Sequence, residues 1–208
     1  MSSATIHPDK LGIMLIDAQP FFLGEWMHGN KDPVLVRLER LLMLSDWLKL
    51  PFIATFEHPV DEKGWLPERL ERMFPQHGQR FVKKTFNCCS EVPIRNAITK
   101  LLITQVAVAG GETDVCILQS SLGLIDMGLQ VFLLEDCLFT SERHARPALD
   151  RMYHGGVIPS TLKTLYYELI RTVDTEARPR EWMERARTFE EFFKFPQLES
   201  LPPWEPAS

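Results

Sequence analysis

The chain has 208 residues, the length of one ordinary domain or of one domain with a small extension. Hydrophobic residues make up 45% of it and charged residues 25%, a balance that is typical of packed globular proteins and excludes a disordered chain, a collagen or a coiled coil. The net charge of −5 comes without any basic block, so we expect no nucleic-acid partner.

The sequence also carries no sign of a membrane or secretory protein. No apolar run approaches the 18 residues of a membrane helix, and the first residues, MSSATIHPDK, lack the pattern of a secretory signal. The four cysteines are too few and too irregularly spaced for a disulfide framework. We therefore expect a cytoplasmic protein with reduced thiols and no membrane partner.

The first half of the chain alternates short apolar runs with a segment of helical period. Residues 11–17 (LGIMLID) are apolar on both faces, as buried parallel strands are. Residues 34–48 follow with hydrophobic side chains at helical spacing. Residues 51–56 (PFIATF) predict a second strand that opens on proline, and residues 80–84 (RFVKK) predict a weaker third strand.

The second half repeats this alternation. Strands are expected at residues 105–110, 130–135 and 156–160, and helices at residues 92–102, 113–128, 145–153 and 162–170. The helix over 113–128 is the best defined, because its hydrophobic residues recur at intervals of three and four. Alternating strands and helices need crossover connections, so we predict a mostly parallel sheet of six strands with helices on both faces.

The last part of the chain, residues 174–208, differs in composition from the domain of residues 1–173. It is rich in Arg, Glu and Pro and contains four closely spaced phenylalanines. We expect one or two short amphipathic helices and a Pro-rich tail. Exposed aromatic side chains at this density would promote aggregation, so we expect this extension to dock on the domain or on a partner subunit.

Three polar or reactive side chains stand where predicted strands end, which is where parallel sheets place their sites. Asp17 closes the first strand, Lys83 and Lys84 close the third, and Cys116 lies just past the fourth. Each alone has an ordinary explanation as a turn cap, a solvated lysine or a small buried residue. Together they are the base, cation and nucleophile of a hydrolase.

The expected chemistry of these groups centres on the thiol. We expect the helix N-terminus and a lysine ammonium to lower the pKa of Cys116, because both stabilise a thiolate. The Asp17 carboxylate can take the thiol proton. Gly110 and Gly111 allow a backbone that directs N–H groups at an oxyanion, and Thr113 is the expected N-cap of the following helix.

Three segments resemble motifs of the isochorismatase-like cysteine hydrolase superfamily. LIDAQPFF is similar to its apolar strand ending in Asp-x-Gln, and VKKTFN to its strand ending in Lys before an aromatic residue. AGGETDVCILQSSLGLIDMGLQVFLLEDC is similar to its Gly-x-x-Thr-x-x-Cys helix with the strand that follows. The resemblance spans about residues 10–170. It implies a Rossmann-like three-layer α/β/α sandwich around a six-stranded sheet.

The resemblance implies a catalytic trio of Asp17 as base, a lysine, and Cys116 as nucleophile. Counting back from Asn87 without a gap selects Lys83, which we favour, whereas a one-residue deletion would select Lys84. The family also has a non-proline cis peptide, which falls here before residue 112. It would direct the N–H groups of residues 112 and 116 at an oxyanion.

The remaining expectations concern the pocket and its ligands. The oxyanion hole is assigned to Glu112 and Cys116, and the substrate pocket to Gln19, Phe22, Trp26 and Asn87. The nicotinamidase branch of the family holds a metal with an Asp and two His after its second strand. Here FEHPVDEKGWL contains one histidine, His58, so we expect no metal and no other cofactor.

The sequence thus predicts a cysteine-dependent hydrolase that cleaves an amide-like C–N bond of a small molecule through a thioester. The resemblance and the Phe-rich extension also favour a homo-oligomer, whether dimer, tetramer or larger. An alternative is a non-catalytic binding or scaffold member of the same fold. A nucleotide-binding domain is disfavoured, because DAQPFF replaces the Gly-rich phosphate loop after the first strand.

Overall fold

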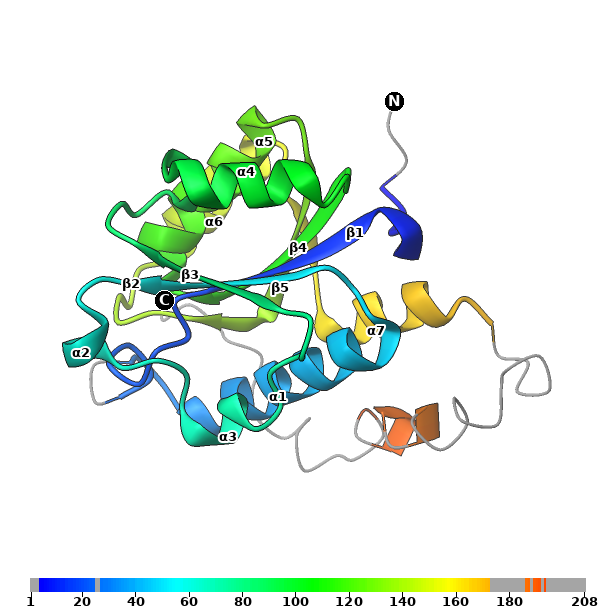
Figure 1. The fold of residues 1–208 in the computed structure, drawn as a ribbon. Coiled ribbons are helices and arrows are strands. Elements are labelled where there is room, and N and C mark those ends of the chain that lie inside the picture. Colours follow the sequence, from blue (N-terminus) through cyan, green and yellow to red (C-terminus); the bar gives the residue numbers. More distant parts are fainter. Residues whose placement is uncertain (1–3, 25–26, 173–185, 188, 192, 194–208) are drawn as a thin grey trace.

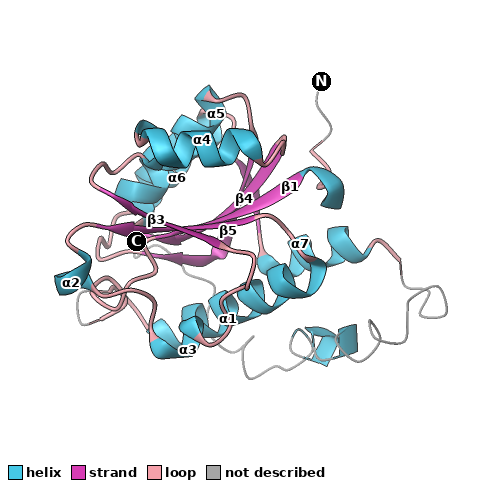
Figure 2. Ribbon diagram, viewed as in Figure 1, coloured by secondary structure: helices cyan, strands magenta, loops and turns pink. Residues whose placement is uncertain are grey.

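The structure is a computed structural model that describes residues 4–24, 27–172, 186–187, 189–191 and 193. Six parallel strands form one sheet in the order β3-β2-β1-β4-β5-β6. Helices α1, α3 and α7 cover one face of the sheet, and α4, α5 and α6 cover the other (Figures 1 and 2). The three-layer α/β/α architecture predicted from the sequence is therefore confirmed.

The elements follow one another in the predicted alternation. The strands are β1 (Leu11–Ile16), β2 (Phe52–Glu57), β3 (Gln79–Lys83), β4 (Gln105–Gly111), β5 (Gln130–Phe139) and β6 (Ile158–Ser160). The helices are α1 (Lys31–Leu48), α2 (Val60–Lys63), α3 (Glu68–Glu71), α4 (Val92–Lys100), α5 (Leu118–Asp126), α6 (Arg146–His154) and α7 (Leu162–Ile170). Shorter turns are η1 (Pro8–Lys10), η2 (Cys88–Ser90) and η3 (Thr113–Ile117).

Three boundaries differ from the sequence prediction. Helix α1 begins at Lys31, because the side chain of Asn30 accepts a hydrogen bond from the backbone N–H of Asp32 and caps it. Strand β5 runs on to Phe139, with a shift in its pairing to β4. The helix expected over 113–128 starts as a π-helical turn, η3, and becomes α-helical only in α5.

The strands supply both halves of the hydrophobic core. Every residue of β1 is buried, and successive side chains alternate between the two faces. Ile13 and Leu15 belong to the cluster that contains α1 and α7. Met14 and Ile16 belong to the cluster that contains α4 and α5. This two-sided burial holds β1 at the centre of the sheet, where its carboxyl end is flanked by those of β2 and β4.

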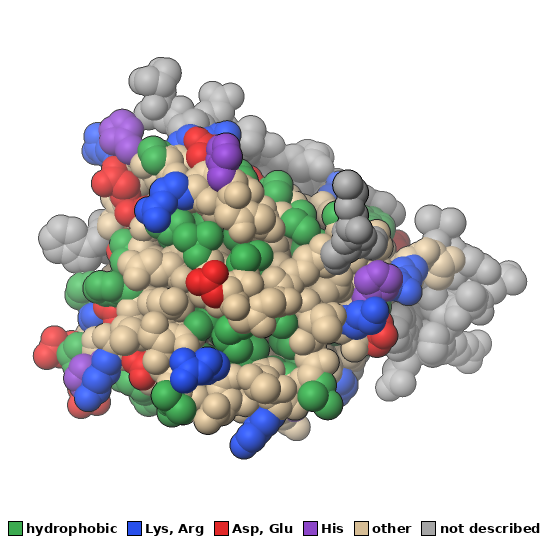
Figure 3. All heavy atoms as spheres, turned by 90° about the horizontal axis from the view of Figure 1, so that it is seen from above, with side chains coloured by type: hydrophobic (Ala, Val, Ile, Leu, Met, Phe, Trp, Pro, Cys, Tyr) green, Lys and Arg blue, Asp and Glu red, His purple; other side chains and the backbone are tan. Residues whose placement is uncertain are grey.

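The outer surface mixes side-chain types. Viewed from the side of α4, α5 and α6, hydrophobic side chains are interspersed with charged ones (Figure 3). Val92, the first residue of α4, and Leu102, two residues beyond its end, are both exposed. Among the described residues, none of the helices is long and apolar enough to cross a membrane.

The described part of the C-terminal segment packs on the domain, while the rest of residues 174–208 lies outside the described residues. The Phe189 side chain is 2% exposed, and its ring stacks on those of Trp47 (centroids 5.8 Å apart) and Tyr166 (5.3 Å). The Tyr166 hydroxyl donates a hydrogen bond to the carbonyl of Ala186 at 3.4 Å. These contacts tie the segment to α1 and α7.

We propose that this docking is part of the domain's stability. Truncating Phe189 to alanine would empty the space between two stacked rings, so we expect a loss of about 3 to 5 kcal/mol in the free energy of unfolding. Urea denaturation followed by fluorescence measures it. The exposed neighbour provides the control, because Arg187→Ala should leave the urea midpoint unchanged. An equal midpoint for both variants would mean that the segment does not dock.

Candidate active site

Four ionisable side chains meet at the carboxyl edge of the sheet, on the side of α2 in Figure 1. Asp17 directly follows β1, Glu57 ends β2 and Lys83 ends β3, while Cys116 lies in the π-helical turn after β4. Strands β3, β2, β1 and β4 are consecutive neighbours in the sheet. Their carboxyl ends therefore bring residues that are distant in the sequence into one cluster.

The centre of this cluster is a fully buried ion pair. The Nζ of Lys83 lies 2.6 Å from Oδ2 of Asp17, and neither side chain has any exposed surface. The Thr55 hydroxyl donates a hydrogen bond to Oδ1 of Asp17 at 2.9 Å. Burial raises the pKa of Asp17 against the opposing effect of the ammonium. Burial lowers the pKa of Lys83, but Asp17 and the other groups around the ammonium together outweigh it, so the net pKa is raised and the ammonium stays charged.

The Cys116 thiol lies between the ammonium and a second carboxylate. Lys83 Nζ donates to Cys116 Sγ at 3.4 Å, and Sγ donates to Oε2 of Glu57 at 3.3 Å. The residue is only 3% exposed. Burial and the charge of Asp17 raise the pKa of the Cys116 thiol, and Lys83 only partly opposes them. The expectation of a lowered thiol pKa is therefore wrong, because the sequence does not reveal the burial, and the charge of Asp17 raises this pKa as well.

The two adjacent lysines occupy opposite environments. Lys83 is buried among the site residues, whereas Lys84 is exposed and its backbone N–H donates to the Glu91 carboxylate at 2.8 Å. Successive side chains of a strand point to opposite faces, so only one of the two can reach the cluster. The structure brings Lys83 to Asp17 and Cys116.

Glu57 is the site residue that the sequence analysis missed. Its carboxylate makes a hydrogen-bonded ion pair with Lys63 on α2, and it lies 3.7 Å from Lys83 Nζ. Burial raises the pKa of Glu57, but hydrogen bonds from Lys63 and Cys116 outweigh it and hold this pKa below its ordinary value. The strand-end rule could have found it. The second strand was expected to end at Phe56, but its last residue is Glu57.

Gln19, an expected pocket residue, is fully buried and holds the end of β2. Its Nε2 donates to the backbone carbonyls of Glu57 (3.2 Å) and Gly64 (2.7 Å), and its Oε1 accepts from the Glu57 N–H at 2.6 Å. Both ends of the amide are therefore occupied by protein groups. Gln19 fixes the position of Glu57 and joins the loop after β1 to the loop after β2.

The other expected pocket residues lie in different settings. Phe22 is partly buried, and Phe21 beside it is 47% exposed, with the Lys63 ammonium 5.5 and 5.8 Å from their ring centroids. Trp26 lies outside the described residues. Asn87 caps η2, because its Oδ1 accepts from the Cys89 N–H at 2.9 Å.

The backbone before Cys116 has an unusual conformation. The peptide bond between Gly111 and Glu112 is cis, as the family resemblance implies. Gly110 has a φ of +117°, and an added Cβ there would lie 1.9 Å from the Ile16 carbonyl oxygen on β1. A glycine is therefore required at this position for steric reasons.

Thr113 is not the N-cap that the sequence predicted. It is the first residue of η3, and its hydroxyl donates to the Phe139 carbonyl at 3.1 Å. The carbonyl of Glu112 instead accepts the backbone N–H groups of Val115 (3.2 Å) and Ile117 (3.0 Å). The π-helical turn makes the difference, because its wider turn lets one carbonyl accept from a residue five positions ahead.

Three of the site residues carry atoms of the kinds that bind metal ions. Asp17, Glu57 and Cys116 each have one oxygen or sulfur atom in a group whose members lie within 4.8 Å of one another. Lys83 Nζ lies at 2.6, 3.7 and 3.4 Å from these residues, so it takes the place that a bound cation would take. The sulfur atoms of Cys88 and Cys89 are 3.9 Å apart and buried in the core.

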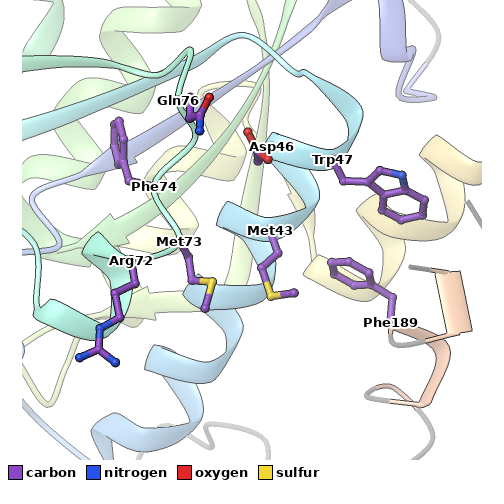
Figure 4. Close-up of a pocket in the computed structure, with 8 residues that line it drawn as sticks. All are labelled: Met43, Asp46, Trp47, Arg72, Met73, Phe74, Gln76 and Phe189. Atoms are coloured by element: carbon purple, nitrogen blue, oxygen red, sulfur yellow. The ribbon is translucent and has the colours of Figure 1, made fainter. Parts of the chain in front are cut away.

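A hollow of about 300 Å³ lies away from this cluster. It is formed by the second half of α1, the loop before β3 and Phe189, and includes Met43, Trp47 and Met73 (Figure 4). Helix α1 leads into the amino end of β2, so this hollow is at the opposite edge of the sheet. Its lining contains none of the groups gathered at the strand ends.

Known proteins resemble this chain over most of its length. Residues 13–164 match the family model of the isochorismatase domain. Isochorismatase domain-containing protein 2 of Rattus norvegicus is 31% identical over 170 residues, which cover 78% of each chain.

Two solved structures share the fold. The YcaC gene product of Escherichia coli, described as an octameric hydrolase of unknown specificity, has a TM-score of 0.80 at 22% identity, over 97% of this chain and 96% of its own. The nicotinamidase PncA of Bacillus subtilis has a TM-score of 0.63 at 14% identity, over 73% of this chain and 99% of its own.

The raised pKa of Cys116 leads to a pH-dependence that distinguishes it from an ordinary thiol. Below its pKa a thiol gains about tenfold in thiolate per pH unit, so the alkylation rate of Cys116 by iodoacetamide should still be climbing above pH 9. Glutathione, run in parallel, should level off near its ordinary pKa. Peptide mapping assigns the modified cysteine. A plateau for Cys116 at or below pH 8.5 would contradict the raised pKa.

Proposed function

The chain belongs to the isochorismatase family, and we propose that it is a cysteine-dependent hydrolase acting on an amide-like C–N bond of a small molecule. One observation carries the proposal: a buried thiol, Cys116, contacts the ammonium of Lys83 and lies within 4.8 Å of the carboxylate of Asp17. A nucleophile, a proton acceptor and a cation in mutual reach are the parts of acyl transfer.

Proton transfer inside the cluster opens the reaction. Asp17 takes the proton of the Cys116 thiol as the sulfur attacks the substrate carbonyl carbon. The raised pKa of Asp17 suits this role, because burial makes the carboxylate a better proton acceptor. Lys83 stays charged and stabilises the negative charge that passes through the sulfur. The thiol therefore needs no lowered pKa in the free enzyme.

The backbone after β4 provides the oxyanion hole of this proposal. The N–H groups of Glu112 and Cys116 donate to the oxygen of the tetrahedral intermediate, which carries the negative charge. Gly110 and Gly111 support this turn because their lack of side chains lets β4 lie against Ile16 and the Phe139 ring.

Protonated Asp17 then completes the cleavage. It gives its proton to the leaving nitrogen, the C–N bond breaks, and the amine or ammonia departs from a thioester on Cys116. The regenerated carboxylate takes a proton from water, whose hydroxyl attacks the thioester carbon. The acid is released as the proton returns to the sulfur, so each proton borrowed by Asp17 is given back within the cycle.

The decisive assay is ammonia release from a panel of small primary amides. Cys116→Ala should lower kcat/KM by at least about 1,000-fold, because it removes the nucleophile. Cys137→Ala provides the matched control, since that cysteine lies in the hydrophobic core among the α1 and α7 side chains. Equal turnover by wild type and Cys116→Ala would refute the assignment. A folded wild-type protein that turns over no amide would instead support the non-catalytic alternative.

Variants of the two adjacent lysines can be compared in the same assay. Lys83→Met removes the ammonium from the cluster and should abolish turnover, whereas Lys84→Met changes an exposed side chain and should leave it intact. Circular dichroism of the Lys83 variant shows whether its fold survives the loss of the buried partner of Asp17. Loss of activity in Lys84→Met alone would transfer the role to that residue.

We also propose that the chain is a cytoplasmic homo-oligomer. All four cysteines are free thiols, which suits a reducing compartment. The structurally similar YcaC protein is described as octameric, and Val92 and Leu102 expose hydrophobic side chains. Sedimentation velocity over about 1 to 100 µM protein should give a mass at least twice that of the 24.0 kDa chain. A monomer throughout that range would contradict the proposal.

A further inference from the structure

Glu57 is held in place by hydrogen bonds to both its backbone and its side chain. Gln19 exchanges two hydrogen bonds with its backbone, and Lys63 pairs with its Oε1. The other oxygen, Oε2, faces Cys116 and accepts a hydrogen bond from its thiol at 3.3 Å. Asp17 is completely buried, while the Glu57 side chain keeps some exposed surface. Glu57 thus stands between the buried ion pair and the solvent.

Catalysis would deprive this Oε2 of its hydrogen-bond donor. When the thiol proton moves to Asp17, the sulfur no longer donates to Glu57. Lys63 remains on the other oxygen and keeps the carboxylate ionised. A partly buried carboxylate oxygen that loses its donor is costly unless another donor replaces it. The group that lies beside the sulfur at that moment is the bound substrate.

The order of the strands sets the direction in which the substrate lies. The proposed oxyanion hole follows β4 and Glu57 ends β2, and β1 with Asp17 runs between them. Neighbouring strands are about 4.8 Å apart, so the ends of β2 and β4 lie about 10 Å apart with the end of β1 between them. A planar amide with its oxygen toward β4 therefore directs its nitrogen toward β2.

The distances fit such an arrangement. The attacked carbon lies about 3 to 3.5 Å from the sulfur in a reactive complex, and its nitrogen is bonded to that carbon at about 1.3 Å. An acceptor that is itself 3.3 Å from the sulfur, on the side of that nitrogen, is within hydrogen-bond reach of its N–H.

We propose that Glu57 is a specificity-determining residue whose Oε2 accepts the N–H of the scissile amide, so that the enzyme selects primary or monosubstituted carboxamides and ureas. This inference rests on the proposed amide hydrolysis and names its substrate class. Esters and N,N-disubstituted amides present no hydrogen to Glu57 and leave its Oε2 without a hydrogen-bond donor. Gln19 acts as a positioning residue, because it fixes the backbone of Glu57 without facing the substrate.

Glu57→Gln tests this with little change in shape. Lys63 donates to the Oε1 side, so the glutamine oxygen should turn to Lys63 and its NH₂ toward the substrate, where it opposes an N–H. We expect kcat/KM for a carboxamide to fall by about 100-fold. The methyl ester of the same acid should change by less than about threefold, since its alkoxy oxygen can accept from that NH₂.

Glu62→Gln is the matched control, because Glu62 is an exposed carboxylate on α2. It should leave both rates unchanged. An equal fall for amide and ester in Glu57→Gln would overturn the specificity role while leaving the hydrolase proposal intact. No wild-type turnover of either substrate would instead show that the hydrolase proposal itself has failed.

A second readout separates selection of the substrate from activation of the thiol. Methyl methanethiosulfonate reacts with thiolates and contains no amide. The negative charge of Glu57 contributes to the raised pKa of Cys116, so Glu57→Gln should react with this reagent faster than wild type at pH 8. A faster thiol with slower amide hydrolysis supports the proposal. A slower thiol would make Glu57 the proton acceptor and overturn it.

Discussion

Asp17 and Lys83 face each other 2.6 Å apart with no exposure to solvent, and neither charge could remain in that place alone. Removing a carboxylate or an ammonium from water costs several kcal/mol after all relaxation, and the cost is offset only when a partner and further hydrogen bonds are in place. The sheet meets this condition by bringing β1 and β3 to either side of β2. A lysine side chain is long enough to pass over the end of β2 to Asp17. The arrangement of the thiol and of Glu57 follows from that crossing.

The site is close to electrical balance, and this is how a thiol with a raised pKa can serve as the nucleophile of the proposed reaction. Asp17 pairs with Lys83, and Glu57 pairs with Lys63. The neutral thiol adds no charge. Releasing its proton to solvent would leave one uncompensated negative charge in a buried place, whereas passing it to Asp17 keeps the total unchanged. The proton is therefore retained within the cluster rather than exchanged with water.

The sequence was sufficient for the features that depend on pattern and order. Alternating apolar runs and helical periods predicted the α/β sandwich, and the rule that sites follow strand ends selected Asp17 and Cys116. It favoured Lys83 over Lys84 only through the count back from Asn87, because one residue of strand register reverses which side chain faces the site. It missed Glu57 through a one-residue error in a strand boundary. The predicted direction of the thiol pKa shift was wrong because burial is a property of the folded chain.

Gln19 has a further consequence for the two loops beside the cluster. Its amide joins the segment after β1 to the segment after β2, and the backbone N–H of Phe21 also donates to the carbonyl of Lys63. These hydrogen bonds hold the two segments together beside the cluster, so separating them would break the bonds together. The amide that positions the Glu57 carboxylate thereby also couples the two loops.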